Sequence, residues 1–326
     1  MNATDLYKWK VCVRCFTFNH APYIIDALNG FCMQETSFPF VCTIVDDAST
    51  DSEPEIIKSY LEEHFDLCED YLNNIRETDD YQLVFVRHKS NKNCFFAVLF
   101  LKYNHRQVKK NKFTYIEEWI NNSKYIAICE GDDYWIDPAK LQKQATFLEA
   151  NPDYTICATN ALTLWENGVN VPSYFRKFYK DGEFTMSQLI GNWAFATATL
   201  FYRRTVLDNY PKWTKQLFFG DMTLMLIATH LGKFQVLSSI TAVYRKSNEN
   251  ENSVTRKMAN KMDYVNQQQV KLYELFNEWT EGKYADEVLK EIEHRKKEVK
   301  FYKYRKKGRL VPYLMMPMYM IKKKLN

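Results

Sequence analysis

The segment at residues 130–135 has a composition that suits metal chemistry. It reads Glu-Gly-Asp-Asp-Tyr-Trp, and the carboxylates of Glu130, Asp132 and Asp133 directly follow the apolar run 125–129. That run predicts a buried strand, so the carboxylates would meet just beyond a strand end. Clustered carboxylates provide hard oxygen ligands, which suit Mg²⁺ or Mn²⁺ holding a diphosphate better than Zn²⁺. The segment predicts metal-assisted transfer from a nucleotide; the alternative is a solvated acidic turn.

Elements of two kinds must position these carboxylates. Apolar runs predict strands at residues 11–17, 41–45, 83–86 and 125–129. Amphipathic patterns predict helices at 22–33, at 50–61 with a capping box of Ser52 and Glu55, and at about 95–109. Alternating strands and helices are typical of an α/β fold with a parallel sheet and right-handed crossovers.

The predicted strands end in polar residues in a coordinated way. The first ends at residues 17–20, the second at 46–51 and the fourth at 130–133, and each of these segments contains hydrogen-bonding or acidic side chains. Ligands of parallel α/β sheets bind beyond the carboxyl ends of the strands. We therefore expect these three segments to converge on one binding edge.

The second half of the chain gives weaker signals. Asp137 is expected to cap a helix that has Pro138 at its first position. Further strands are predicted near residues 197–202 and 234–244, with a helix at 222–231 closed by Gly232. From residue 256 onward the pattern is helical and increasingly basic.

Composition indicates a folded globular protein rather than a disordered chain. The chain has 326 residues, of which 46% are hydrophobic and 16% aromatic. Residues 295–326 carry a net charge of +11 and the remainder −7, whereas a nucleic-acid binder would carry its basic stripe across the folded domain. We therefore expect no nucleic-acid partner.

The eight cysteines are expected to be reduced core residues of a cytoplasmic protein. Cys12 and Cys15 form a C-x-x-C pair, but a separation of three within a strand places their side chains on opposite faces. No signal peptide and no apolar run long enough to span a membrane are visible. These features predict a cytoplasmic location.

The basic C-terminal segment predicts contact with a membrane surface. Residues 300–307 alternate bases with aromatics, and the apolar residues 310–321 contain two prolines and precede three lysines. Such a segment can lie at the inner face of the cell membrane, where each basic residue contributes about 1 kcal/mol near anionic lipid. The alternative is that it packs on the body of the protein or forms a dimer contact.

The chain resembles the family 2 glycosyltransferases, whose nucleotide-diphospho-sugar transferase fold is called GT-A. The resemblance covers roughly residues 9–255. Four markers occur in the order expected for the family, at residues 17–24, 45–51, 130–135 and 220–221. The resemblance implies a Rossmann-like, mostly parallel sheet flanked by helices, here with a helical basic C-terminal extension.

The resemblance also implies roles for individual residues. Asp132 would bind the metal, Mn²⁺ or Mg²⁺, and Asp221 would be the general base of an inverting transfer, the alternative for Asp221 being a helix N-cap. Nucleotide binding would involve Thr17, Asn19, Asp46, Asp47 and Glu130. The donor sugar or its diphosphate would contact Asp133, Arg245 and Lys246, since the histidine that many relatives carry near Ser247 is missing here. His20 is expected to be structural or to bind weakly, and residues 191–193 to line the acceptor pocket unless Trp193 lies in the core.

These roles predict sugar transfer from a nucleotide-diphosphate donor, by default a UDP-sugar, to a hydroxyl of a glycan or lipid-linked acceptor in surface polysaccharide synthesis. Residues 1–135 would form the nucleotide-sugar-binding half, residues 136–255 the acceptor-binding half of the same domain, and residues 256–326 a tail. The open alternatives are a sugar-nucleotide nucleotidyltransferase and a non-catalytic scaffold or glycan-binding protein with the same fold. A nucleotidyltransferase would want a Gly-rich basic phosphate loop, which residues 17–20 do not provide.

Overall fold

The computed structural model describes residues 7–66, 75–108, 110–165, 173–176, 178–217, 219–246, 258 and 261–306. The chain divides into two compact units. Unit 1 contains Met1–Glu183, Ala194–Asn209 and Leu231–Lys246, and unit 2 contains Phe184–Trp193, Tyr210–His230 and Ser247–Asn326. The subdivision expected at residues 135 and 255 stays a prediction.

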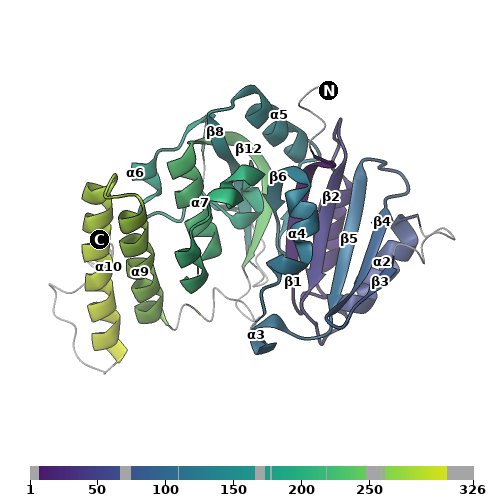
Figure 1. Ribbon diagram of the computed structural model, residues 1–326, viewed down its shortest axis with the longest axis horizontal. Coiled ribbons are helices and arrows are strands. Elements are labelled where there is room, and N and C mark those ends of the chain that lie inside the picture. Colours follow the sequence, from purple (N-terminus) through teal and green to yellow (C-terminus); the bar gives the residue numbers. More distant parts are fainter. Residues whose placement is uncertain are drawn as a thin grey trace. The chain divides into compact units, whose positions relative to one another are not determined.

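Unit 1 is built around one large mixed sheet (Figure 1). Its order is β10-β12-β8-β11-β6-β1-β2-β5-β4-β3, with β7 beside β12 and β9 beside β8. The strands are β1 Trp9–Thr17, β2 Phe40–Asp46, β3 Ile75–Glu77, β4 Tyr81–Arg87, β5 Cys94–Leu101, β6 Ser123–Ile128, β7 Tyr134–Trp135, β8 Tyr154–Trp165, β9 Ser173–Tyr174, β10 Gly182–Glu183, β11 Phe201–Arg203 and β12 Lys233–Lys246.

Strand direction brings several carboxyl ends to one edge of this sheet. β5, β2, β1 and β6 are parallel neighbours at its centre. β11 runs antiparallel to both β6 and β8, so β8 runs in the direction of β6, and β12 is parallel to β8. The ends of β1, β2, β6, β8 and β12 therefore lie along the same edge, where ligands of such sheets bind.

Five α-helices in the described part of unit 1 connect and cover these strands. They are α1 Ile24–Cys32, α2 Glu53–His64, α3 His105–Val108, α4 Phe113–Asn121 and α5 Lys140–Ala150. α1 buries Ile24, Ala27, Leu28 and Phe31, the spacing of one helical face, against the core formed by the central strands. The mixed α/β, mostly parallel architecture expected from the sequence is confirmed.

Four local predictions were wrong. Residues 197–199, expected to begin a strand, form a 3₁₀ turn, and the strand β11 is Phe201–Arg203. Residues 94–101 form the buried strand β5 rather than the start of a helix, because a continuous apolar run fits a strand buried on both faces. Ser52 makes no capping bond; instead Asp51 accepts from the backbone N–H of Glu53 at 3.1 Å. Asp137 precedes α5 by more than one position, although its carboxylate accepts from the N–H of Ala139 at 2.9 Å.

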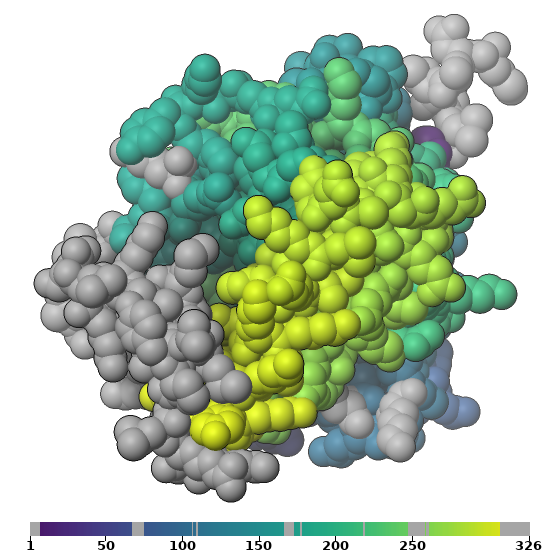
Figure 2. All heavy atoms as spheres, turned by 90° about the vertical axis from the view of Figure 1, so that its left-hand side faces the viewer, coloured from purple at the N-terminus to yellow at the C-terminus, as the bar shows by residue number. Residues whose placement is uncertain are grey.

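Unit 2 is helical in the part that the structure describes. Its α-helices are α6 Met186–Leu189, α7 Gly220–Leu231, α9 Met262–Trp279 and α10 Ala285–Lys306; short 3₁₀ segments are η2 Thr197–Thr199 and η3 Arg204–Asn209 in unit 1 and η4 Lys212–Gln216 in unit 2. α9 and α10 lie side by side (Figure 2) and bury Leu272, Phe276 and Val288. No described helix has the length and hydrophobicity to cross a bilayer. The apolar part of the tail, 310–321, lies outside the described residues.

Candidate active site

The end of β1 is fixed by a buried carboxylate. Glu53, at the start of α2, is fully buried, and its carboxylate accepts from the hydroxyl of Thr17. The same carboxylate accepts from the backbone N–H of His20 and from the hydroxyl of Ser49, both at 2.9 Å. Thr17, predicted to bind the nucleoside, is therefore held in place by a residue to which the sequence analysis gave no role.

The turns after β1 and β2 are also tied to each other. Asn19 accepts from the N–H of Thr50 at 2.8 Å through its side chain, while its own N–H donates to Ser49 at 2.9 Å. Asn19 has φ 56° and Ala48 has φ 57°, a left-handed conformation that costs energy for residues other than glycine. Strain of this kind concentrates where a fold holds loops in place for binding.

Asp46 and Asp47 end β2 in different surroundings. Asp46 is 2% exposed, and the backbone N–H of Ser49 lies 3.3 Å from each of its carboxylate oxygens. Burial raises the pKa of Asp46 from its ordinary 3.8 to about 6. A carboxylate with so little compensation can accept a further hydrogen bond from a ligand.

Asp47 is saturated by protein groups. Its Oδ1 accepts from the backbone N–H of His105 at 2.8 Å and lies 3.1 Å from that residue's Nδ1. Its Oδ2 pairs with the ammonium of Lys112 at 3.1 Å. The carboxylate thus fastens the loop between β5 and α4 to the end of β2. Neither His105 nor Lys112 was predicted, because these contacts span more than fifty residues of sequence.

Glu130 turns back toward the sheet. Its Oε1 pairs with Arg14 of β1 at 2.5 Å, and its Oε2 accepts from the backbone N–H of Phe16 at 3.0 Å. The Arg14 guanidinium lies 4.9 Å from the Phe16 ring centroid and 5.2 Å from that of Phe113. Both carboxylate oxygens are thus occupied by the neighbouring strand, and Glu130 locks the residues after β6 to β1.

Gly131 permits a very close approach to β1. Its N–H donates to the carbonyl of Phe16 at 3.1 Å, and a Cβ at this position would lie 2.2 Å from Thr17 Oγ1. No side chain fits there, so glycine is required for this packing. The result is that Asp132 emerges immediately beside the end of β1.

Asp132 and Asp133 point into different environments. The Asp132 side chain is 43% exposed, with one oxygen 3.9 Å from His20 Nε2. Asp133 is buried and accepts from the backbone N–H of Arg245 at 2.9 Å; burial raises its pKa well above the ordinary value. Of the three acidic residues in this segment, Asp132 has the most exposed side chain.

Arg245 and Lys246 lie at the end of β12. The guanidinium of Arg245 pairs with Asp26, donates to the carbonyl of Asp132 at 3.1 Å and lies 4.4 Å from the ring centroid of Tyr134. The ammonium of Lys246 instead lies 4.9 Å from the ring centroid of Trp165. Adjacent residues of a strand face opposite sides of a sheet, so the side chains of Arg245 and Lys246 lie on opposite faces.

The exposed carboxylate of Asp132 suits a hard divalent cation. Mg²⁺ and Mn²⁺ are commonly held by one or two carboxylates together with the phosphates of the substrate, so one protein ligand is compatible with a metal that arrives with a nucleotide. Within the described ranges, no group of three or more acidic, His or Cys residues is placed to hold a metal by itself. These residues therefore fit a metal that takes its other ligands from the nucleotide, and not a structural metal held by the protein alone.

Asp221 belongs to unit 2, in the first turn of α7. Its Oδ1 lies 2.8 Å from the backbone N of Met222, within the same helix start. Because α7 begins at Gly220, Asp221 lies inside its first turn and not at the N-cap position of the alternative interpretation, from which a side chain would accept from an N–H two or three positions on. A base role requires a measurement that separates it from capping.

Residues 191–193 lie in unit 2 and are held by α9 and α10. The N–H of Gly191 donates to the hydroxyl of Tyr273 at 2.8 Å, and the Gly191 carbonyl accepts from Arg295 at 3.2 Å. Trp193 is 51% exposed, which places its ring outside the core.

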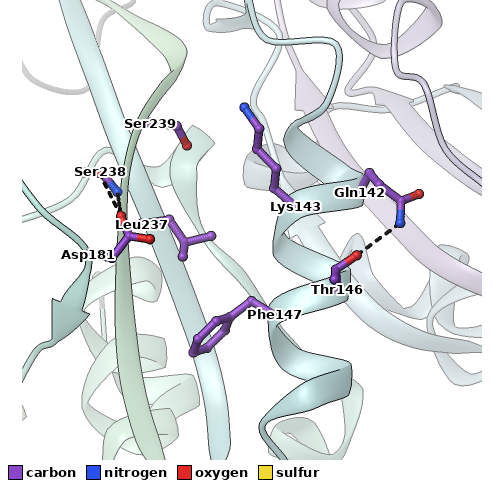
Figure 3. A pocket seen from close by; sticks show the side chains of 8 residues that line it. All are labelled: Gln142, Lys143, Thr146, Phe147, Asp181, Leu237, Ser238 and Ser239. Carbon is purple, nitrogen blue, oxygen red and sulfur yellow. Dashed lines mark hydrogen bonds between the residues drawn. The ribbon is translucent and has the colours of Figure 1, made fainter.

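A cavity of about 630 Å³ lies between α5 and β12. Figure 3 shows Lys143 and Phe147 on one side and Leu237 and Ser239 on the other. Asp181 accepts from the N–H and the hydroxyl of Ser238, both at 2.7 Å. None of the predicted site residues lines this cavity, so the two features are separate.

The fold places the protein in a structural class. Crystal structures of S. aureus TarS 1-349, alone and in complex with UDP-GlcNAc, each match 91% of this chain with a TM-score of 0.50 and 18% identity, and the match covers 72% and 73% of those chains. This likeness concerns the fold, which is GT-A.

The sequence then gives the family. A family model described as glycosyl transferase family 2 matches residues 13–210, and the chain belongs to this family. Uncharacterized proteins from Mycobacterium tuberculosis and Mycobacterium bovis are 29% identical over 231 residues, or 71% of this chain. The matched region spans 57% of the length of those relatives.

Proposed function

We propose that the protein transfers a sugar from a nucleoside-diphosphate donor to a hydroxyl of a glycan or lipid-linked acceptor. The observation that carries this proposal is the convergence of Asp46 and Asp132 on one sheet edge, one buried and one exposed. Family membership supports glycosyl transfer as the reaction class.

The donor is proposed to bind across the ends of β1, β2 and β6. Asp46 accepts a hydrogen bond from the base, because its buried carboxylate has little internal compensation. Uridine is the proposed base; the complex of TarS with UDP-GlcNAc is a property of that protein and supports only the ligand class. Asp132 holds Mn²⁺ or Mg²⁺ together with the donor diphosphate.

A bound metal would offset the negative charge that develops on the leaving diphosphate. Residues of the protein position the groups that would contact the donor. Glu130 and Gly131 fix where the Asp132 carboxylate stands, and Arg245 binds the Asp132 carbonyl. The hydrogen bonds of Thr17 with Glu53 and of Asn19 with Thr50 hold the part of the site that would bind the nucleoside in one conformation.

Asp221 is proposed as the general base that takes the proton from the acceptor hydroxyl. An alcohol is a poor nucleophile until a positioned carboxylate accepts its proton. One base and one displacement would invert the anomeric centre of the transferred sugar.

The matched variant Asp221→Asn separates this role from helix capping. Asparagine caps helices as well as aspartate does, so the fold should survive while the base is lost. We expect turnover with a UDP-sugar to fall about 10²- to 10⁴-fold, with UDP affinity and thermal unfolding unchanged. Wild-type turnover in the variant would show that Asp221 is not the base.

Surface polysaccharide synthesis and contact with the inner face of the cell membrane are proposed from the basic apolar tail. The test is binding to vesicles of anionic and of neutral lipid, with and without residues 308–326. Selective binding to anionic vesicles that the deletion abolishes supports the proposal. Equal binding by the truncated chain would contradict it.

A further inference from the structure

A small group of strands connects the Asp132 segment to a second surface. β7, which directly follows Asp133, pairs with β12 through Ala242 and Val243. β12 pairs in parallel with β8 up to its last residue, Lys246, whose register partner is Trp165. β12 is therefore the neighbour of β7, which follows the carboxylates, and β8 is the next strand in the same sheet.

The two faces of β12 differ at this end. Arg245 lies on the face of Tyr134, where its backbone N–H also binds Asp133. Tyr244 and Lys246 lie on the other face, since residues two apart in a strand share a side. Trp165 joins them, because register partners in parallel strands point the same way.

These three residues form what we call the cation–aromatic platform: Trp165, Tyr244 and Lys246. The Lys246 ammonium lies 4.9 Å from the Trp165 ring centroid and 5.7 Å from that of Tyr244. Trp165 is 37% exposed, and Phe175 packs edge-on against Tyr244 with centroids 5.3 Å apart. Phe175 thus supports the platform, and the Trp165 ring is partly exposed.

The charge of Lys246 is not matched by a described acid. Among residues for which the structure gives side-chain contacts, no carboxylate pairs with this ammonium, and burial lowers its pKa. A partly buried cation between aromatic rings, without an internal counter-ion, is a site for an anion. Lys246 ends β12 on the same sheet edge as Asp132, where a reactant would bind.

Resting on the function proposed above, we propose that the cation–aromatic platform binds the acceptor, and that the acceptor is a sugar chain bearing an anionic group. The aromatic rings pack against the apolar C–H face of a sugar ring, and Lys246 makes a charge-assisted hydrogen bond to a carboxylate or phosphate on that chain. Lys246 thereby serves the acceptor, whereas the donor diphosphate lies on the Asp132 side of β12.

The experiment measures binding of three oligosaccharides by calorimetry: a galacturonate hexamer, a phosphorylated mannopentaose and the neutral maltohexaose. The wild-type chain should bind at least one anionic oligosaccharide more tightly than the neutral one, and which of the two it prefers distinguishes carboxylate from phosphate. Lys246→Met should weaken that binding about tenfold and Trp165→Ala by a similar factor, since charge-assisted bonds and ring contacts are each of this size. UDP affinity in the presence of Mn²⁺ should stay within about twofold.

Lys233→Met is the matched control, because Lys233 begins the same strand and pairs at its exposed end with Asp153 and Glu183. It should leave oligosaccharide binding unchanged. The proposal is overturned if Lys246→Met weakens UDP as much as the oligosaccharide, which would assign Lys246 to the donor. It is also overturned if the control loses as much affinity, or if the wild type shows no preference for the anionic chains. Failure of the wild type to bind UDP would instead contradict the proposed function itself.

Discussion

The two acidic turns of unit 1 use their carboxylates differently. In the β2 turn, residues 46–51, both Asp46 and Asp47 are buried. In the β6 turn, residues 130–133, Asp133 is buried, and the Asp132 side chain is more exposed than that of Glu130, 43% against 29%. Buried acceptors suit recognition of a base, whereas an exposed carboxylate suits a metal that must enter and leave with the donor.

Each turn nevertheless pairs a residue that holds the fold with one left for a ligand. Asp47 is saturated by His105 and Lys112, as Glu130 is by Arg14 and Phe16. The comparison teaches that adjacent acidic residues in a motif need not share a function. Position within the turn, and the strand or loop it faces, decides which carboxylate remains available.

The difference between Asp46 and Asp47 should have its largest effect on the free energy of unfolding. Asp47→Asn should lower the free energy of unfolding by about 3 kcal/mol, because the ammonium of Lys112, only 24% exposed, loses its charged partner. Asp46→Asn should instead raise it by about 1–2 kcal/mol at pH 7, since the amide has no charge to desolvate. Urea unfolding of both variants measures the difference; equal destabilisation would remove the distinction between the two residues.

The next effect concerns the backbone of the β6 turn. Gly131→Ala should cost about 2 kcal/mol of stability, because the new Cβ would meet Thr17 and force β1 and the turn apart. The same displacement should weaken metal-dependent UDP binding. A variant with wild-type unfolding and wild-type UDP affinity would show that the close approach is not needed.

A pH titration examines the β2 turn. If the base donates to the ionised form of Asp46, UDP affinity should fall up to about tenfold per pH unit below about 6. Because its folded-state pKa exceeds the ordinary 3.8, ionised Asp46 lowers stability as pH rises through this range, so stability and affinity change in opposite directions. Asp46→Asn should remove both trends. A wild-type affinity that stays constant from pH 7 to 5 would exclude Asp46 as the acceptor.

The smallest effect is expected at Ala48. Ala48→Gly should stabilise the protein by up to about 1 kcal/mol, because glycine adopts φ near 57° without the steric cost. Thermal unfolding measures this change, and UDP affinity should be preserved. A destabilised variant would mean that the entropy lost by glycine outweighs the relief of strain.

The location of the site could be predicted from the sequence more reliably than the carboxylates that remain available to a ligand. Strand ends at Thr17, Asp46 and Glu130 were recognisable from apolar runs followed by polar residues, and their shared edge follows from parallel order. β5 was missed because its unbroken apolar run has no period that separates strand from helix.

Hydrogen bonds and ion pairs between residues far apart in the sequence could not be predicted. Glu53 lies in a sequence that fits a helix start, so its hydrogen bond to Thr17 had no local signal. The pairing of Glu130 with Arg14 spans 116 residues, and only the fold shows that both of its oxygens are occupied. A charged residue inside the apolar first strand, Arg14, was the one available hint that an acid would have to meet it.

The central claim is that Asp132 holds the donor's metal while Glu130 only positions it. The most direct measurement is calorimetry of UDP binding with and without Mn²⁺ in the wild type, Asp132→Asn and Glu130→Gln. We predict that Asp132→Asn abolishes the increase in UDP affinity caused by Mn²⁺. Glu130→Gln should lower UDP affinity modestly but keep the ratio of the affinities with and without Mn²⁺. Loss of this increase in Glu130→Gln, or its survival in Asp132→Asn, would contradict the account.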